Sequence, residues 1–307
     1  MPSASTTSTT ESTPEPGEML AVVNTPNGPA VTALRSVPEP ETAADTAVIE
    51  VHAFSLNRGE LALLAARPEG WRPGQDIAGV VVTPAADGSG PRPGTRVIGL
   101  VAGAGWSQRI AAPTTRLAPL PDTVDFALAA ALPLAGLTAL RTLRLGGALL
   151  GKRVLVTGAT GGVGSFAVQL AERAGARTTG VTDATEAPNE LFDLILESVG
   201  GPSLTAAINR IAPSGTVAVF GNSSNTDAPL NVYQFVGHEG ARLQTYFSYA
   251  SGPEEEIGMD LGVLVTLLAQ GVLSAEIGAQ MSWRELDKGM TALRDRRVVG
   301  KVIFKVD

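Results

Sequence analysis

A glycine-rich segment, VLVTGATGGVG at residues 154–164, points most clearly to chemistry. Ala159, Gly161 and Gly164 fall on the three small-residue positions of a dinucleotide-binding fingerprint. These positions permit a tight turn, the approach of a pyrophosphate to the backbone, and close packing of helix on strand. An apolar strand pattern precedes the segment and an amphipathic helix pattern follows it, so free N–H groups of the first helical turn would face the phosphates. We expect a dinucleotide to contact Ala159, Thr160, Gly161, Gly162, Val163 and Gly164; the alternative is a strand–helix turn that binds no nucleotide.

The second strand of this unit, residues 177–182, leads to the expected adenosine ribose. Asp183 follows Gly164 by 183 − 164 = 19 residues, where an acidic side chain accepts from a ribose 2′-hydroxyl, and Thr182 stands beside it. A carboxylate there would favour NADH over NADPH, because a 2′-phosphate would face a negative charge. The alternative is a solvated loop aspartate. The expected cofactor is thus NADPH or NADH, with no cofactor as the alternative.

The linker after this strand is unusually short. Only nine residues, 183–191, separate it from the next apolar strand, FDLIL. A parallel crossover with its own helix needs at least about 10–12 residues. We therefore expect an extended strap in place of one helix and one edge strand, which would have formed the wall against which adenosine rests.

Metal ligands are scarce in this sequence. It has no cysteine and only two histidines, His52 and His238, which excludes thiolate zinc sites, iron–sulfur clusters and three-histidine centres. We expect His52, within a strand, to be structural, and His238 lies in a loop without an evident partner. No metal is expected, and nothing indicates a Ser-His-Asp hydrolase.

The pattern of apolar residues differs between two regions of the chain, and these regions supply the strands and helices that must position the candidate site residues. Residues 19–122 show short apolar runs broken by Gly and Pro, which predicts an all-β domain with one helix at 59–66. From 123 to 252, strands alternate with helices, which predicts a doubly wound parallel sheet. Residues 253–307 contain two helices and a closing strand, whereas the Ser/Thr/Pro-rich residues 1–18 predict a disordered tail.

Charge and hydropathy limit the partners and the location. The formal charge is 23 − 30 = −7 with no basic block, which argues against nucleic acid and anionic membranes. The longest apolar run, 126–140, is shorter than the roughly 20 residues that span a bilayer. The N-terminus lacks the basic and apolar regions of a secretory signal. We expect a cytoplasmic protein with a small-molecule substrate.

Together with GATGGVG, several segments resemble the medium-chain dehydrogenase/reductase superfamily, in its zinc-independent, quinone-oxidoreductase-like branch of actinobacterial type. They are SLNRGE (55–60), RPEGWRPGQDIAGVV (67–81), LPLAGLTALRTL (132–143), FDLILESVGG (192–201), GTVAVFGNSS (215–224) and RRVVGKVIF (296–304). The resemblance implies a GroES-like β-barrel domain, a Rossmann domain inserted after it, and a C-terminal return to the first domain. Zinc-dependent members carry a cysteine near position 57 and a His-Glu pair where this chain has Gln75-Asp76.

The resemblance also implies further site residues in a cleft between the two domains. The implied catalytic residues are Asn57, Thr138 and Tyr246; the implied cofactor contacts are Ser198, Val199, Gly221, Asn222 and Lys301; the implied pocket walls are Trp71 and Trp106. Plainer alternatives exist for several of them. Asn57 could cap a turn, Thr138 could cap a helix, Tyr246 could be strand packing, and Asp76 is expected to be structural.

These observations predict a metal-free NAD(P)H-dependent reductase of an enone or quinone, acting by hydride transfer and possibly serving secondary metabolism. The alternative, motivated by the shortened adenosine wall, is a non-redox cyclase or isomerase that uses the same cleft without nicotinamide. A homodimer through the apolar strand Leu243–Tyr249 is also expected.

Overall fold

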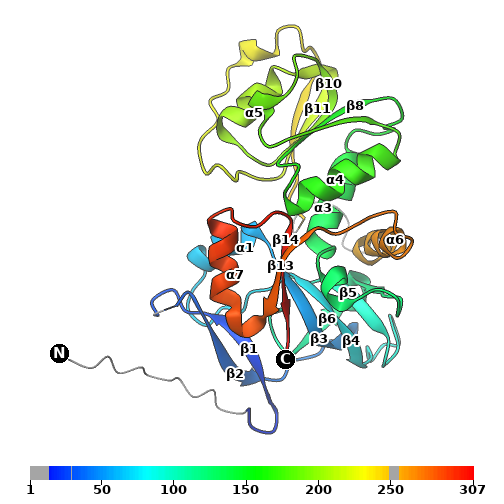
Figure 1. Ribbon diagram of the computed structural model, residues 1–307. Coiled ribbons are helices and arrows are strands. Elements are labelled where there is room, and N and C mark those ends of the chain that lie inside the picture. Colours follow the sequence, from blue (N-terminus) through cyan, green and yellow to red (C-terminus); the bar gives the residue numbers. More distant parts are fainter. Residues whose placement is uncertain (1–13, 29, 249–255) are drawn as a thin grey trace, which may run out of the picture.

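The computed structural model describes residues 14–28, 30–248 and 256–307 and contains two sheet-based bodies joined by helices (Figure 1). A mixed sheet lies at one end and a parallel sheet at the other. The α/β class expected from the sequence is confirmed. Most of the expected N-terminal tail, residues 1–13, lies outside the described residues.

Seven strands form the mixed sheet, in the order β13-β14-β3-β4-β5-β7 with β6 paired to β3. They are β3 (Thr46–Leu56), β4 (Asp76–Thr83), β5 (Arg96–Leu100), β6 (Arg109–Pro113), β7 (Leu117–Pro119), β13 (Ile277–Ser282) and β14 (Lys301–Lys305). Because β14 pairs antiparallel with β3, the end of the chain completes a sheet that begins near its N-terminus.

A separate hairpin of β1 (Glu18–Asn24) and β2 (Thr32–Pro38) lies against the mixed sheet. The Val22 N–H donates to the Trp106 carbonyl at 2.8 Å, which ties the hairpin to the sheet. The sequence did not predict β2 or β7, because β2 is mostly half-exposed and β7 is only three residues long. Helix α1 (Arg58–Ala66) lies where a helix was expected.

The second body is a five-stranded parallel sheet in the order β12-β11-β10-β8-β9. Its strands are β8 (Arg153–Thr157), β9 (Arg177–Val181), β10 (Phe192–Glu197), β11 (Ile211–Val219) and β12 (Arg242–Thr245). Between β9 and β10, where every residue is described, the chain forms only the short 3-10 turn η2 (Ala184–Glu186), and β9 is left as an edge strand. The shortened Rossmann sheet expected from the nine-residue linker is confirmed.

Helices cover both sheets, and several of them pack in a core that the two sheets share. They are α2 (Phe126–Ala130), α3 (Pro133–Arg144), α4 (Gly162–Arg173), α5 (Gly201–Ile208), α6 (Ile257–Ala269) and α7 (Leu286–Arg294), with 3-10 turns η1 (Thr114–Arg116), η3 (Val232–Phe235) and η5 (Trp283–Glu285). The main core contains Ile98 of β5, Leu137 of α3 and Leu196 of β10, all fully buried. Helix α3 therefore links the two sheets by continuous apolar packing.

The strap 183–191 covers part of the sheet surface that the missing helix would have covered. Ala184 and Ala187 are buried in a small core with Leu155 of β8 and Phe192 of β10. Two alanines fill far less volume than a helix would, so this side of the sheet is covered thinly.

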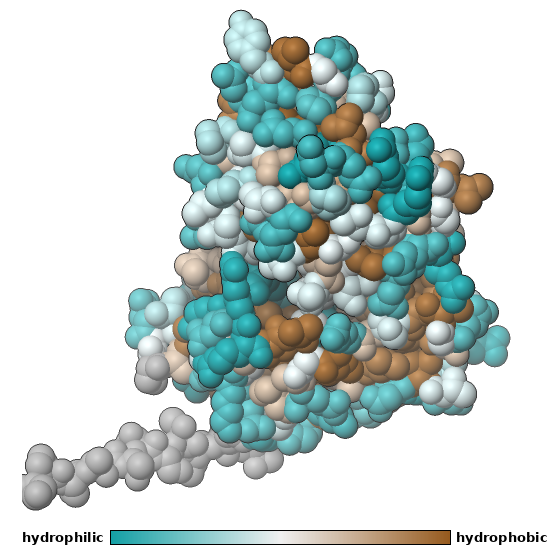
Figure 2. All heavy atoms as spheres, turned by 45° about the horizontal axis from the view of Figure 1, so that its top comes forward, coloured by the Kyte–Doolittle hydropathy of each residue, from teal (hydrophilic) through white to brown (hydrophobic). Residues whose placement is uncertain are grey.

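The surface of the molecule carries polar and apolar regions. Figure 2 shows polar side chains over much of one face, with apolar side chains gathered in its lower half. Within the described ranges, every helix is too short or too polar to cross a bilayer. Strand β12 is shorter than the expected Leu243–Tyr249, because it ends at Thr245, and Tyr249 lies outside the described residues.

Candidate active site

The glycine-rich turn joins β8 to α4 with the geometry that its sequence requires. Gly158 has φ +60°, and a Cβ on Gly164 would come within 2.2 Å of the Gly158 carbonyl oxygen. Gly161 is exposed, and a Cβ there would meet only that same oxygen, at 3.1 Å. Among the described residues, the N–H groups of Gly162 and Val163 find no backbone acceptor. The turn therefore leaves an open cradle with free donors at a helix N-terminus, which fits a pyrophosphate.

Thr182 and Asp183 lie beside this turn, as the sequence predicted. The Gly158 N–H donates to the Thr182 carbonyl at 3.1 Å, which holds the end of β9 against the turn. The Asp183 carboxylate accepts from the Thr185 N–H at 2.8 Å and caps η2. Asp183 thus fixes the start of the strap, and its contact with a ribose stays a prediction.

Two further turns follow β10 and β11 and are bonded to each other. The Ser223 N–H donates to the Ser198 carbonyl at 3.0 Å, and the Ser224 N–H donates to the Val199 carbonyl at 2.8 Å. A Cβ on Gly200 would come within 2.1 Å of the Asn222 side-chain oxygen, and one on Gly221 within 2.9 Å of the Ser198 carbonyl oxygen. The two turns are therefore held together as one rigid pair. They contain four of the predicted cofactor contacts, Ser198, Val199, Gly221 and Asn222.

A buried polar cluster lies where the two bodies meet. The Lys301 ammonium donates to Asn57 Oδ1 at 2.5 Å and to Asp76 Oδ2 at 3.3 Å, and Asn57 Nδ2 donates to Asp76 Oδ2 at 2.8 Å. All three side chains are buried, with Lys301 4% exposed and Asp76 fully covered. Asp76, expected to be structural, is thus the centre of a charged network that includes two predicted site residues.

Lys301 also connects this cluster to the glycine-rich turn. Its preceding residue, Gly300, donates its N–H to the Thr160 carbonyl at 3.1 Å. A Cβ on Gly162 would come within 2.7 Å of Lys301 Cδ, so the aliphatic stem of the lysine lies directly against the start of α4. The C-terminal strand therefore carries a lysine whose aliphatic stem lies against the turn and whose ammonium group reaches Asn57.

Glu60 and Ser55 complete the cluster, and the sequence analysis did not identify either. Glu60 accepts from the Asn57 N–H at 2.8 Å and from the Gln75 N–H at 2.9 Å, while the Ser55 hydroxyl donates to Asp76. Burial, followed by the nearby Asp76 carboxylate, raises the pKa of Glu60 from 4.5 to about 8. The segment SLNRGE, on which the expectation for Asn57 rested, also contains Ser55 and Glu60. Only the pairing of β3 with β4 brings Ser55 and the start of α1, with Glu60, close to Asp76.

Thr138 and Tyr246 are both buried. Thr138 lies in the middle of α3, so the expectation that it caps a helix is wrong. Tyr246 has Arg141 and Asp260 as charged neighbours, and burial raises the pKa of its phenol. Its hydroxyl is covered, and Arg141 donates to Asp260 at 2.7 Å. The structure thus separates Tyr246 from the contacts that surround Asn57.

The structure excludes one of the two tryptophans as a pocket wall, and for Trp71 that role stays a prediction. Trp106 is fully buried and stacks on Phe54 in the core of the mixed sheet, with ring centroids 5.5 Å apart, so it cannot present a surface to a substrate. Trp71 is half-buried and packs against the same core. Both sit next to glycine or proline, which left open that they only cover a turn; for Trp106 the structure shows core packing instead.

His52 has the structural surroundings that the sequence predicted, whereas His238 has a partner that it did not predict. His52 stacks on Phe126, with ring centroids 4.7 Å apart. His238 is not without a partner, because its Nδ1 lies 2.5 Å from the Ile211 carbonyl oxygen. Within the ranges that the structure describes, no three His, Asp or Glu side chains gather as metal ligands.

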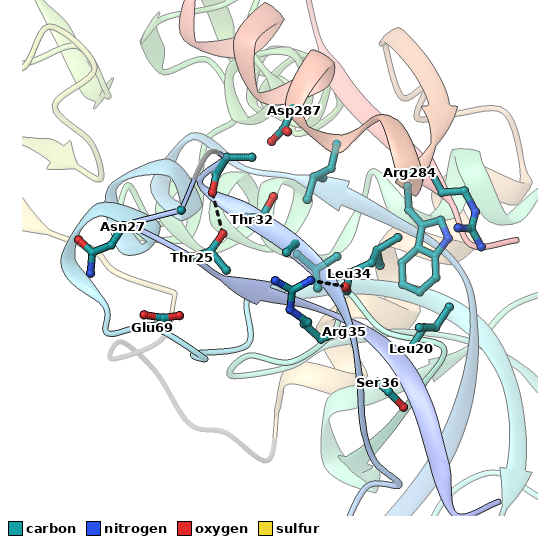
Figure 3. A pocket seen from close by; sticks show the side chains of 16 residues that line it. Leu20, Thr25, Asn27, Thr32, Leu34, Arg35, Ser36, Glu69, Arg284 and Asp287 are labelled. Carbon is teal, nitrogen blue, oxygen red and sulfur yellow. Dashed lines mark hydrogen bonds between the residues drawn. The ribbon is translucent and has the colours of Figure 1, made fainter. Parts of the chain in front are cut away.

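One pocket, of about 490 Å³, lies between the hairpin β1–β2 and the η5–α7 segment (Figure 3). Leu20, Leu34 and Leu286 contribute apolar side chains to it, and Arg35 and Glu69 contribute charged ones. None of the site residues predicted from the sequence lines this pocket, so it is not the expected interdomain cleft.

Comparison with known proteins supplies a family context for this geometry. Residues 171–304 match the family described as zinc-binding dehydrogenase. A solved structure of an alcohol dehydrogenase superfamily protein from Novosphingobium aromaticivorans superposes with a TM-score of 0.84 at 24% identity, covering 94% of this chain and 100% of that one. This likeness shows that the two proteins share their fold.

Three of the relatives that match in sequence illustrate the range of the likeness. Spectinabilin polyketide synthase system protein NorB of Streptomyces orinoci is 30% identical over 95% of this chain, and acryloyl-coenzyme A reductase of Metallosphaera sedula is 28% identical over 50%. Quinone oxidoreductase of Pseudomonas aeruginosa is 29% identical over 62% of this chain and 67% of its own length. The chain spans 15% of NorB and 51% of the acryloyl-coenzyme A reductase.

Proposed function

We propose that this chain, which belongs to the medium-chain dehydrogenase/reductase superfamily in its quinone-oxidoreductase-like branch, is an NAD(P)H-dependent reductase that needs no metal. The observation that carries the proposal is the open glycine-rich turn with Lys301 and Asn57 directly beside it. A bound nicotinamide cofactor would supply a hydride. The residues of this chain then have to hold the cofactor, orient the substrate and provide a proton.

Three parts of the structure support the proposed cofactor site. The cradle at Gly161–Gly164 would take the pyrophosphate, the end of β9 with Thr182 and Asp183 would take the adenosine ribose, and the paired turns at 198–200 and 221–224 would line the rest of the crevice. We propose NADH as the preferred form, because the carboxylate of Asp183 would repel a 2′-phosphate.

The proposed substrate is a carbon–carbon double bond activated by a carbonyl, as in an enone, a quinone or an unsaturated thioester. The names of the relatives, a quinone oxidoreductase and an acryloyl-coenzyme A reductase, support this class. Asn57 and Lys301 each keep a donor hydrogen beyond those used in the cluster, which would polarise the carbonyl oxygen. Tyr246, the acid that the resemblance implied, has a fully covered hydroxyl, so we propose that water supplies the proton.

Titration with NADH and NADPH, followed by thermal unfolding, tests the proposal. At 100 times its dissociation constant a ligand stabilises the fold by about 2.7 kcal/mol. Stabilisation by NADH, and more weakly by NADPH, is the expected result. The variant Gly161→Asp should keep the wild-type melting temperature and lose the ligand response, because its side chain would fill the cradle without meeting the core.

A non-redox cyclase or isomerase is the second candidate, favoured by the absence of the usual strand and helix beyond β9. Millimolar NADH and NADPH that leave the melting temperature unchanged would sink the reductase proposal and favour this one. A cytoplasmic location and a role in secondary metabolism also stay proposals.

We also propose a homodimer through the edge of the parallel sheet. All four residues of β12 are exposed, and the neighbouring Val232, Tyr233 and Val236 are each more than 70% exposed. Such an uncovered strand edge with apolar neighbours is a ready template for pairing. Light scattering after size exclusion should give twice the chain mass for the wild type and the monomer mass for Leu243→Arg.

A further inference from the structure

Glu197 ends β10 at the centre of the parallel sheet and is fully buried. Its strand pairs with β8, and the chain order reverses between these two strands, since β9 lies on one side of β8 and β10 on the other. In open parallel sheets, ligands bind outside the carboxyl ends of the strands at this point of reversal. Glu197 therefore lies at the base of the proposed cofactor crevice, although the sequence analysis assigned it no role.

The carboxylate of Glu197 collects donors from both sides of that crevice. Its Oε1 accepts from Ser203 Oγ at 2.8 Å, from the Val199 N–H at 3.1 Å and from Thr157 Oγ1 at 3.3 Å. Its Oε2 accepts from the Gly200 N–H at 3.0 Å. The salt bridges of the described residues include none to Glu197. A buried carboxylate is tolerated only with such donors, so its position and that of the turn 198–200 fix each other.

One of these donors extends the network to the strap. Ser203 Oγ, besides donating to Glu197, accepts from the Ala184 N–H at 3.0 Å. Ser203 and Ala184 are both fully buried. The strap residue that follows Asp183 is thus connected through a single hydroxyl to the carboxylate that holds the opposite turn.

Resting on the proposed cofactor binding, we propose that Glu197 is a positioning residue for the adenosine half of the cofactor. It holds the strap 183–191 and the turn 198–200 at a fixed separation, and so replaces the support that the absent strand and helix would give. The Glu197 side chain touches no ligand itself and acts through Ser203, Ala184 and the two turn N–H groups.

ADP-ribose, which is NAD without its nicotinamide ring and keeps the adenosine and the pyrophosphate, is the probe. We expect Glu197→Ala to weaken ADP-ribose binding about tenfold in calorimetric titration, because both sides of the site lose their common acceptor. Glu197→Gln keeps the volume and one acceptor oxygen, so it should recover affinity to within about threefold of the wild type.

Asp193 provides the matched control. It lies on the same strand and accepts from the Arg153 N–H at 2.8 Å, so it also ties β10 to β8, but at the end of the sheet away from the crevice. Asp193→Ala should lower the melting temperature while leaving the ADP-ribose dissociation constant within about twofold.

The outcomes separate the two proposals. A wild type that binds neither NADH nor ADP-ribose overturns the proposed function and this inference with it. A wild type that binds both, with a folded Glu197→Ala variant of unchanged affinity, overturns the inference alone, as does an equal loss in Asp193→Ala. If Glu197→Ala does not fold, Ser203→Ala decides, because it cuts only the connection to the strap; it should weaken ADP-ribose binding by about threefold or more, and unchanged binding refutes the role.

Discussion

Asp76 in the mixed sheet and Glu197 in the parallel sheet are both fully buried carboxylates, but different partners stabilise them. Asp76 accepts from the Lys301 ammonium, the Asn57 amide, the Ser55 hydroxyl and the Leu134 N–H. Glu197 accepts only from neutral hydroxyl and backbone donors among the described contacts. One site is compensated by a cation, the other by hydrogen bonds alone.

The hydrogen-bond donors of Asp76 and those of Glu197 also come from different parts of the fold. Those of Asp76 come from β3, α1, α3 and β14, so the cluster forms only when the two ends of the chain meet. Those of Glu197 come from the end of β8, the turn after β10 and the start of α5, all within the parallel sheet and its connections. The first cluster holds the two bodies together, whereas the second shapes a single crevice. The first should therefore respond most to loss of charge, and the second to loss of a single donor.

Removal of the cation should have the largest effect on stability. Lys301→Met leaves Asp76 and Glu60 buried together without a positive charge, and breaking a buried pair in this way costs about 3–5 kcal/mol. Urea unfolding measures the loss. Lys305→Met, at an exposed position of the same strand, is the control and should change stability by less than about 0.5 kcal/mol. A loss below about 1 kcal/mol for Lys301→Met would mean that Asp76 does not depend on the cation.

Loss of one hydroxyl should distinguish the two sites next. Ser203→Ala is expected to cost about 1–2 kcal/mol, because Glu197 has no cation and the Ala184 N–H loses its acceptor. Ser55→Ala is expected to cost less, under about 1 kcal/mol, since Asp76 keeps Lys301 and two other donors. The same unfolding measurement compares them, and an equal or reversed order would contradict the distinction between charge and hydrogen bonding.

A third difference should appear as a dependence on pH. The folded pKa of Glu60, about 8, lies above its ordinary value of 4.5, so between these values the folded chain binds more protons than the unfolded chain. The free energy of unfolding should therefore fall as the pH rises through this window. Glu60→Gln removes the titrating group, and its unfolding free energy should vary less with pH than that of the wild type. Parallel profiles for the two proteins would show that Glu60 does not titrate there.

Local spacing was enough to predict the glycine-rich turn and the shortened sheet. Gly158 supplies the positive φ of the turn, and Gly164 lies against the Gly158 carbonyl within the same strand–turn–helix unit, so the fingerprint and its structure coincide. The missing strand followed from counting the nine residues of the linker, because a chain of that length cannot form a helical crossover.

Partners far apart in sequence could not be predicted in the same way. Asn57 and Lys301 were predicted as separate site residues from a family resemblance, and no feature of the sequence identified Glu60 or Glu197 as site residues. Nothing in the segment FDLILES shows that its glutamate faces inward at the end of β10. Trp106 and Thr138 were misjudged for the same reason, since core packing and the length of α3 decide their surroundings.

The sequence by itself determined the architecture of the parallel-sheet body: a cradle at 158–164, a second strand that ends before Asp183, and a strap too short for a helix. These features depend on the conformations of neighbouring residues, which short-range sterics set. The tertiary structure alone decided the electrostatics of the site, because a buried charge is stable only beside its donors. It brought Lys301 to Asp76 through the pairing of β14 with β3, and it placed Glu197 among the turns that it holds.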